Sequence, residues 1–329
     1  MYKTIDLFAG IGGIRLGFEK GFGNNTQTVF VSEWDEKAQK TYKANFKENG
    51  IFMGDITKVN EEDIPSFDIC MAGFPCVAFS VAGKREGFED NYKGMCRGTL
   101  FMDVARICDY HKPKVIFCEN VKNLVNHDKK RTFQIIKQTF EEIGYKVFYK
   151  VLNSKDFGVP QSRERIYIVC FRNDIAPETF SFPVGCNKDV RIKDILEDDI
   201  PLNHFMSKKY LTSLREREKR HKEKGNGFSY QPLSLNDIAN TIVCGGCGHE
   251  SNLIVDNRKE IDFSSFKREI NDEYIRKMTP REWARLQGFE DTFVFPCSDT
   301  STYKQLGNSV SVPVIEAIAK KVKEVLEAE

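Results

Sequence analysis

The sequence predicts an α/β protein in which a doubly wound, mainly parallel sheet is joined to a smaller, separate domain. Three observations lead to this prediction. Short apolar runs with strand character alternate with helix-like segments in the first half of the chain. Several of these runs end in glycine or in a single polar residue, as strands do where a sheet binds a ligand at its carboxyl edge. Residues 183–277 differ in composition, and 329 residues suit two domains better than one.

Composition restricts the protein class. Charged residues make up 29% of the chain, and its apolar runs are too short to span a bilayer. Ten cysteines accompany no secretory signal, so we expect reduced thiols in a cytosol and no disulfide framework. The net charge of +1 neither requires nor excludes nucleic acid, and any basic face must be local.

The first predicted strand, residues 4–8, is followed by a glycine-rich turn and a helix over residues 14–22. Glycines such as Gly10 and Gly12 in that turn allow the backbone to approach a ligand closely. The spacing departs from the Gly-x-Gly-x-x-Gly of dinucleotide sites, so a purely structural turn is an equal alternative.

The next two strands also end in polar groups. The strand at residues 28–32 ends at Glu33 and Trp34, where an acid is placed to hold ribose hydroxyls and an indole to cover a purine. Core packing is the alternative for Trp34. A third strand ends beside Asp55, which offers a carboxylate to an exocyclic amine. Together these strand ends predict one adenosyl ligand across the sheet edge.

A cysteine follows the fourth strand. The apolar run 67–72 leads into Gly73, and Pro75 fixes the backbone before Cys76. A rigid turn with nearby backbone N–H groups favours a thiolate nucleophile. The alternative is a small buried side chain.

The alternation continues beyond a long loop at residues 80–97. We expect helices at residues 100–108 and 129–143, and strands at 115–118, 146–152 and 166–169. Glu119 ends a strand that can neighbour the Cys76 strand. In the segment 161–165, period-two alternation would send Gln161, Arg163 and Arg165 to one face, unless the run is a solvated charged surface.

The motifs resemble, in order and spacing, those of DNA cytosine-5 methyltransferases of the bacterial or phage modification-enzyme type. The matching segments are residues 6–13, 73–76, 119–121, 161–165, 280–289 and 305–310. The resemblance covers about residues 4–171 and 278–320. It implies a Rossmann-like S-adenosyl-L-methionine-dependent methyltransferase fold that acts on double-stranded DNA. The unmatched middle is where the family has its target recognition domain.

The resemblance also implies roles for individual residues. Cys76 would add to C6 of a flipped cytosine, Glu119 would contact its N3, and Arg163 and Arg165 would hold the base and the catalytic residues. The residues expected to line the cofactor are Phe8, Gly10, Gly12, Glu33, Trp34, Asp55, Ile56, Pro75, Leu100, Asn308 and Val310. The residues expected to contact DNA are Ser80, Lys84, Arg85, Arg97, Gln161, Thr241, Gly245 and Gly246.

Two departures from the family pattern concern the loop after Cys76. Val77 stands where the family usually has Gln, and the segment 91–96 is longer than in many relatives. The first change affects contacts of the expected DNA-facing loop and leaves the chemistry intact, and the second is expected to alter how this loop closes over DNA.

The middle of the chain contains a basic helix and a glycine-rich loop. In residues 204–224, Lys208 and Arg215 belong either to a phosphate-facing strip or to a solvated helix face. Cys244, Cys247 and His249 have metal-compatible spacing, but no fourth ligand stands nearby. We therefore predict a DNA-contacting loop and no metal.

We expect a catalytic and cofactor-binding domain from residues 1–182 and 306–329, a recognition domain at 183–277, and a hinge and motif segment at 278–305. The last helix would pack on the first domain through Val314, Ile315, Ile318 and Val322. We expect a monomer in the bacterial cytoplasm that is associated with the nucleoid while acting. A cognate restriction endonuclease is expected to accompany it. The alternatives are an RNA (tRNA) cytosine methyltransferase on the same scaffold and a catalytically silent DNA-binding regulator.

Overall fold

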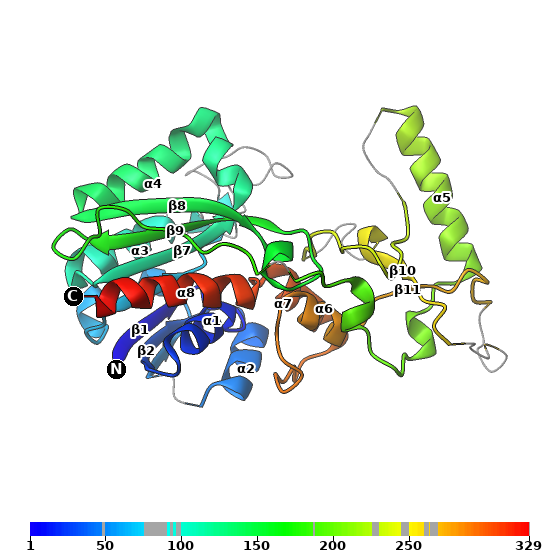
Figure 1. The fold of residues 1–329 in the computed structure, drawn as a ribbon, viewed down its shortest axis with the longest axis horizontal. Helices are drawn as coiled ribbons and strands as arrows, with labels where there is room; N and C mark the ends of the chain where they lie inside the picture. The colour runs from blue at the N-terminus through cyan, green and yellow to red at the C-terminus, as the bar shows by residue number, and fades with distance from the viewer. Residues whose placement is uncertain are drawn as a thin grey trace.

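A seven-stranded sheet forms the larger body of the molecule (Figure 1). The computed structural model describes residues 1–47, 50–75, 91–92, 95–96, 100–186, 188–225, 230–244, 250–259, 263 and 269–328. The strand order is β3-β2-β1-β4-β7-β9-β8, and β9 runs antiparallel between β7 and β8. β1, β2, β3, β4 and β7 are parallel, which confirms the predicted doubly wound sheet.

The strands lie where the apolar runs predict them. Their bounds are β1 Tyr2–Leu7, β2 Thr26–Ser32, β3 Ile51–Met53, β4 Ile69–Ala72, β7 Val115–Val121, β8 Tyr145–Asn153 and β9 Glu164–Arg172. A separate two-stranded ribbon joins β5 (Asn91–Tyr92) to β6 (Met95–Cys96).

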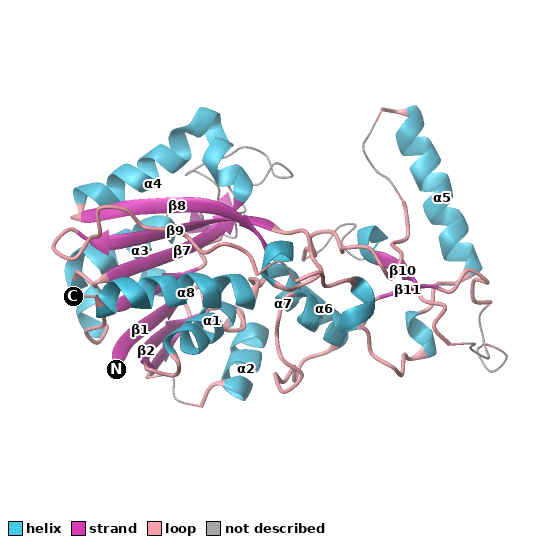
Figure 2. Cartoon of the chain, viewed as in Figure 1, coloured by secondary structure: helices cyan, strands magenta, loops and turns pink. Residues whose placement is uncertain are grey.

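Helices cover both faces of the sheet (Figure 2). One face carries α1 (Gly13–Phe22) and α8 (Val312–Glu327), and the other carries α3 (Leu100–His111) and α4 (Arg131–Glu142). Alternation in β4 supplies both cores, because Met71 packs toward α1 and α8 while Cys70 packs toward α3 and α4. The side chains of Val314, Ile315, Ile318 and Val322 are buried in the first of these cores, which confirms the predicted packing of the last helix.

Close contact between α1 and α8 joins the two ends of the chain. A Cβ at Gly17 would lie 2.5 Å from Ile315, and one at Gly21 would lie 2.5 Å from Ala319. Glycine is therefore required for the approach of these two helices.

The predicted helix at 129–143 begins two residues late, at Arg131. Asp128, Lys129 and Lys130 have φ of 45°, 55° and 74°, so the chain turns through the left-handed region before α4 can start. The predicted basic helix likewise starts later, as α5 (Lys208–Glu223), because the Ser207 hydroxyl accepts a hydrogen bond from the N–H of Tyr210 and caps it.

The smaller body contains α5 and the antiparallel pair β10 (Leu253–Val255) and β11 (Ile275–Lys277), which lie away from the large sheet in Figure 1. Its own apolar cluster includes Leu211, Leu214 and Leu253. α6 (Pro280–Leu286) and α7 (Asp299–Asn308) lie between the two bodies. No helix of the described residues is both long and apolar enough to cross a membrane.

A third core joins segments from both predicted domains. Ile192, Ala239 and Ile242 of the predicted recognition region pack in one cluster with Trp283 and with Tyr42 of α2 (Glu36–Asn45). Part of residues 183–277 is therefore held by the larger body.

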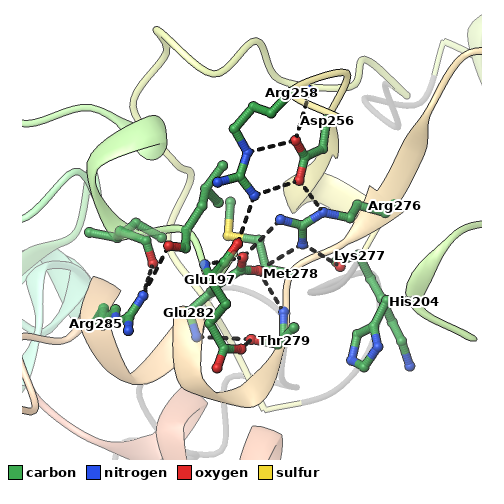
Figure 3. Close-up of polar contacts among 12 residues, drawn as sticks. Glu197, His204, Asp256, Arg258, Arg276, Lys277, Met278, Thr279, Glu282 and Arg285 are labelled. Carbon is green, nitrogen blue, oxygen red and sulfur yellow. Dashed lines mark hydrogen bonds and ion pairs between the residues drawn. The ribbon is translucent and has the colours of Figure 1, made fainter. Parts of the chain in front are cut away.

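A buried ion network fixes β10 and β11 to α6 (Figure 3). The fully buried Arg276 donates from Nε to Asp256 (2.7 Å) and from Nη1 and Nη2 to the two carboxylate oxygens of Glu282 (2.8 Å each). Burial would raise the pKa of Asp256, but the hydrogen bond from Arg258 and the charge of Arg276 lower it to about 2. Glu282 also forms a capping box with Thr279 at the start of α6.

Candidate active site

The glycine-rich turn follows β1 and has the backbone shape that only glycine adopts readily. Gly10 and Gly12 have φ of 56° and 86°, and Phe8 has φ of 56°. A Cβ at Gly12 would lie 2.3 Å from the ring of Phe46, so that position excludes a side chain. A Cβ at Gly10 would meet no described atom within 4 Å, which leaves open space beside the backbone.

Glu33 ties this turn to the end of β2. Its carboxylate accepts the backbone N–H of Gly10 and that of Asp35, each at 2.7 Å, and only 9% of the residue is exposed. The amide of Gln39 donates to its carbonyl at 2.6 Å. Burial raises the pKa of Glu33, while the hydrogen bonds from Asp35 and Gly10 act in the opposite direction. The result is a fixed acceptor group at the sheet edge.

Trp34 is 52% exposed, so the alternative that it packs in the core is wrong. Asp55 follows β3 and accepts hydrogen bonds from the N–H and the hydroxyl of Thr57 through one oxygen, at 3.1 and 2.7 Å. Ile56 is buried, and its carbonyl accepts from Nη2 of Arg106 at 2.8 Å. Leu100, half-buried, begins the helix that carries Arg106.

The carboxyl end of α7 packs against the same glycine turn. A Cβ at Gly13 would lie 2.9 Å from both Ser309 and Val310, although these residues are nearly 300 positions away in sequence. Val310 is buried and Asn308 is exposed. The structure thus brings the predicted residues Gly12, Asn308 and Val310 into one region.

The chain that leads to the predicted nucleophile is also fixed. β4 pairs with β7 in parallel, so that Ala72 lies opposite Cys118. The side-chain amide of Asn120 donates to the carbonyl of Phe74 at 3.2 Å. Pro75 is half-buried, and Cys76 itself lies outside the described residues.

Glu119 ends up beside Arg165 because β7 and β9 are antiparallel neighbours. Arg165 Nε lies 3.3 Å from Glu119 Oε1, yet among the described residues no hydrogen bond reaches that oxygen. Glu119 is 9% exposed, and burial raises the pKa of its carboxyl against the opposing charges of Arg165 and Arg163. This arrangement favours a protonated acid with a free contact position.

Arg163 and Gln161 differ from the expectation. Both side chains are buried, and Arg163 donates to the carbonyls of Ile242 (2.8 Å) and Ser309 (2.6 Å). Burial lowers the pKa of Arg163 to about 9, so it is charged at neutral pH. Gln161 donates to the carbonyl of Leu286 at 2.9 Å, which points to a structural role instead of the DNA contact expected for it. Strand alternation could not show this burial, because the covering segments come from distant parts of the chain.

The expected DNA contacts are only partly described. Thr241 is half-buried, and its hydroxyl donates to the carbonyl of Ser162 at 2.7 Å. The residues Ser80, Lys84, Arg85, Arg97, Gly245 and Gly246, together with Val77, lie outside the described residues.

The two basic residues singled out on α5 have acidic partners. Lys208 lies 3.0 Å from Glu269 and 2.8 Å from Asp272, and Arg215 contacts both carboxylate oxygens of Glu273 at 2.6 and 2.7 Å. These ion pairs favour the alternative of a solvated helix face over a phosphate-facing strip. Cys244 is exposed, and the two other residues of the metal-compatible spacing, Cys247 and His249, lie outside the described residues.

The sheet edge fits an adenosyl group. A buried carboxylate, an exposed indole, a second carboxylate and an open backbone at Gly10 all lie at the ends of β1, β2 and β3. The family model for C-5 cytosine-specific DNA methylases matches residues 2–324. The chain belongs to this family. It is a DNA cytosine-5 methyltransferase, and it takes the methyl group from S-adenosylmethionine.

Relatives with known names agree with the family match. The methyltransferase is 52% identical over 333 residues to Type II methyltransferase M.HpaII of Haemophilus parainfluenzae, covering 99% of this chain and 90% of that one. It is 40% identical to Type II methyltransferase M.HhaI of Haemophilus parahaemolyticus, covering 96% and 93%. The crystal structure of S. pombe Dnmt2 methyltransferase has the same fold, with a TM-score of 0.75, 18% identity, and coverage of 100% and 99%.

Proposed function

We propose that this enzyme methylates C5 of a cytosine flipped out of a specific duplex sequence, with Cys76 as the nucleophile. Cytosine C5 is a poor nucleophile until a thiolate adds to C6. The sulfur–C6 bond forms as Cys76 attacks, and electron density moves toward C5 and N3. The target carbon is shielded in a stacked duplex, so the base must leave the stack. S-adenosylmethionine supplies the electrophilic methyl group. Loss of the C5 proton then expels the Cys76 thiolate and restores the ring.

The observation that carries this proposal is the environment of Glu119. Attack by the thiolate develops negative charge on the ring, and a proton or strong hydrogen bond at N3 stabilises it. The raised pKa of Glu119 favours the protonated acid, and its Oε1 has an ion-pair partner but no hydrogen bond among the described residues. Arg165 fixes the carboxyl, and we propose that it also holds the base.

The cofactor residues follow from the sheet edge. Glu33 would hold ribose hydroxyls, Trp34 would cover the adenine, and Asp55 would accept a hydrogen bond from the exocyclic amine. The second carboxylate oxygen of Asp55 is available for this bond, since its contact among the described residues is an ion pair with Lys58 at 3.6 Å. The remaining lining would come from Phe8, Gly10, Gly12, Ile56, Pro75, Leu100, Asn308 and Val310. Val310 lies against Gly13 of the glycine turn, and Phe8 and Leu100 pack against the core that contains Ile56, which supports this assignment.

Sequence recognition is assigned to residues 183–277 and to the loop 77–97. The similarity to Type II methyltransferases supports action within a restriction-modification system in a bacterial cytoplasm. We propose that the enzyme acts as a monomer and that a cognate endonuclease accompanies it. The match to the family model of DNA methylases over residues 2–324 supports DNA over RNA as substrate. The presence of Glu119 beside Arg165 speaks against a silent regulator.

Covalent trapping tests the nucleophile. Bisulfite sequencing of DNA from an expressing host identifies the methylated site, and a duplex with 5-fluorocytosine at that site should trap the native enzyme, because fluorine cannot leave as a proton. Cys76→Ala should form no adduct and show no methyl transfer, while calorimetry gives an affinity for the cofactor within about threefold, roughly 0.7 kcal/mol. Cys186→Ala, which changes another free cysteine, should be trapped normally. Trapping of Cys76→Ala, or no adduct with the native enzyme on a methylated site, would overturn the mechanism.

A further inference from the structure

Three buried polar side chains form a network outside the reacting centre. Gln161 and Gln287 are fully buried, and Arg163 is almost so. Gln161 Nε2 donates to Gln287 Oε1 at 3.2 Å, which connects the segment before β9 to the end of α6. Buried amides and guanidinium groups must find partners, so the segments that they contact are strongly specified.

The first of these segments is the start of the predicted recognition loop. The N–H of Ile242 donates to Gln161 Oε1 at 3.0 Å, and its carbonyl accepts from Arg163 Nη1 at 2.8 Å. The hydroxyl of Thr241 donates to Ser162. One peptide unit on each side of Ile242 is thereby held by the network.

The second segment is the turn at the end of α7, which carries the predicted cofactor residue Asn308. Gln287 Nε2 donates to the carbonyls of Leu306 (3.0 Å) and Ser309 (3.2 Å). Arg163 Nη2 donates to Ser309 and, at 3.4 Å, to Gly307. The carbonyls on both sides of Asn308 are therefore bound by Arg163, which also holds Ile242, and Gln287 adds a second donor at Ser309.

The two segments also touch each other directly. A Cβ at Gly307 would lie 2.5 Å from the backbone nitrogen of Cys244 and 2.5 Å from the carbonyl carbon of Val243. Gly307 has ordinary helical backbone angles, so glycine is needed here for the contact and not for its conformation. A displacement of residues 243–244 would be transmitted to the Asn308 turn.

We propose that Gln287 is a positioning residue that couples the segment 241–244 to the turn 306–309, so that target DNA and S-adenosylmethionine strengthen one another's binding. The inference rests on the proposed roles of Thr241 and Asn308. Thermodynamic linkage requires the effect to be reciprocal. Gln287 reaches neither ligand in this scheme. It holds the backbone of residues 306–309 directly and the backbone of Ile242 through the side chain of Gln161.

The test measures a ratio of affinities. Calorimetry gives the dissociation constant of the product S-adenosylhomocysteine for the native enzyme, alone and with a duplex carrying the site mapped by bisulfite sequencing. We expect the duplex to tighten binding at least about fivefold. Gln287→Met should reduce this ratio below about twofold. Gly307→Ala, which removes no hydrogen bond and suits a helix, should also reduce it, and it carries the test if Gln287→Met does not fold.

The matched control is Gln305→Met. Gln305 is also a buried glutamine, but its amide joins α7 to α2 by donating to the carbonyl of Lys37 and accepting from Thr41, each at 2.9 Å. The ratio of affinities measured for Gln305→Met should equal that of the native enzyme, even if its thermal stability falls as much as that of Gln287→Met. The coupling would be overturned if folded Gln287→Met and Gly307→Ala both kept the affinity ratio of the native enzyme. It would also be overturned if the duplex did not change the affinity of the native enzyme for S-adenosylhomocysteine. If the native enzyme bound no S-adenosylhomocysteine or methylated no duplex, the proposed function would fail together with this inference.

Discussion

Glu119 shows how a position near the carboxyl end of a strand, β7, becomes reactive. Burying a carboxylate is costly unless it is paired, and the single Arg165 Nε at 3.3 Å offsets only part of that cost. Burial therefore dominates, and the pKa rises above its ordinary value of 4.5. Because the folded protein holds this proton more tightly than the unfolded chain, the stability that it contributes is complete below pH 4.5 and is lost as pH rises through the folded pKa.

The same shift predicts a pH dependence of catalysis. With Glu119→Gln, the single-turnover methylation rate should fall by about 10²–10⁴, the usual contribution of a general acid. The ratio of the native rate to the variant rate should itself decrease as pH rises through the raised pKa of Glu119, because only the native enzyme has a Glu119 proton to lose. Ionisation of Cys76 is common to both enzymes and cancels in the ratio. A ratio that does not change with pH would assign Glu119 a positioning role only.

The position of a single site residue can be predicted from sequence where the pattern that marks it lies next to it in the chain. Glu33, Trp34 and Glu119 follow apolar runs directly, so their place at the sheet edge can be predicted from the run that precedes them. The partners of Gln161 and Arg163 include backbone carbonyls more than 75 residues away. Backbone acceptors carry no residue-type signal, which is why the burial of these two side chains could not be predicted.

At the scale of elements, polar side chains decide where helices begin and how they attach. α5 begins after the Ser207 cap, and α6 begins at Thr279, whose capping box uses Glu282. Glu282 has a second task, because both of its oxygens accept from Arg276 of β11. The sequence resemblance covered the α6 motif but said nothing of Arg276, since its partners Asp256 and Glu282 meet only in the folded chain.

The ion pair between Arg276 and Glu282 predicts that substitutions at these two residues have non-additive effects on stability. Arg276→Met would leave the buried carboxylate of Glu282 without its cation, while Asp256 keeps Arg258, and should lower the free energy of unfolding by about 3–5 kcal/mol. In Arg276→Met combined with Glu282→Gln, the amide oxygen still accepts from the N–H of Thr279 while the buried charge is gone. The double variant should therefore be less destabilised than the sum of the single variants. Urea unfolding of the four proteins measures this cycle, and simple additivity would show that the two side chains act independently.

At the scale of the whole molecule, both ends of the chain build the catalytic body. α1 and α8 pack through Gly17 and Gly21, and the turn after α7 returns to the glycine turn after β1. The order of strands and helices was predictable because each carries its own period of apolar residues. The shared core was not, because Ile192, Ala239 and Ile242 look in sequence like any other apolar residues of the middle region.

This shared core changes how an exchange of target specificity must be designed. The active site reads one flipped cytosine, so neighbouring bases must be read by other groups reaching the grooves. Replacing residues 183–277 with the segment of a relative of known target should move methylation to that relative's sequence. The chimera should fold only if it keeps the native buried residues that belong to the same core cluster as Trp283 and Tyr42. These residues are Ile192, Ile195, Ala239, Ile242 and Ile254. Large-to-small changes at such positions cost about 1–5 kcal/mol each, enough to unfold the chimera.

Bisulfite sequencing of host DNA after expression of this core-retaining chimera measures the outcome. The matched control is the same exchange without the five retained residues, which should give less folded protein by circular dichroism and thermal unfolding. If the chimera is folded and active yet still methylates the original sequence, residues 183–277 do not contain the reader. The loop 77–97, which directly follows Cys76 in the sequence, would then be the segment to exchange next. It is the other part of the chain that we expect to face the bases around the flipped cytosine.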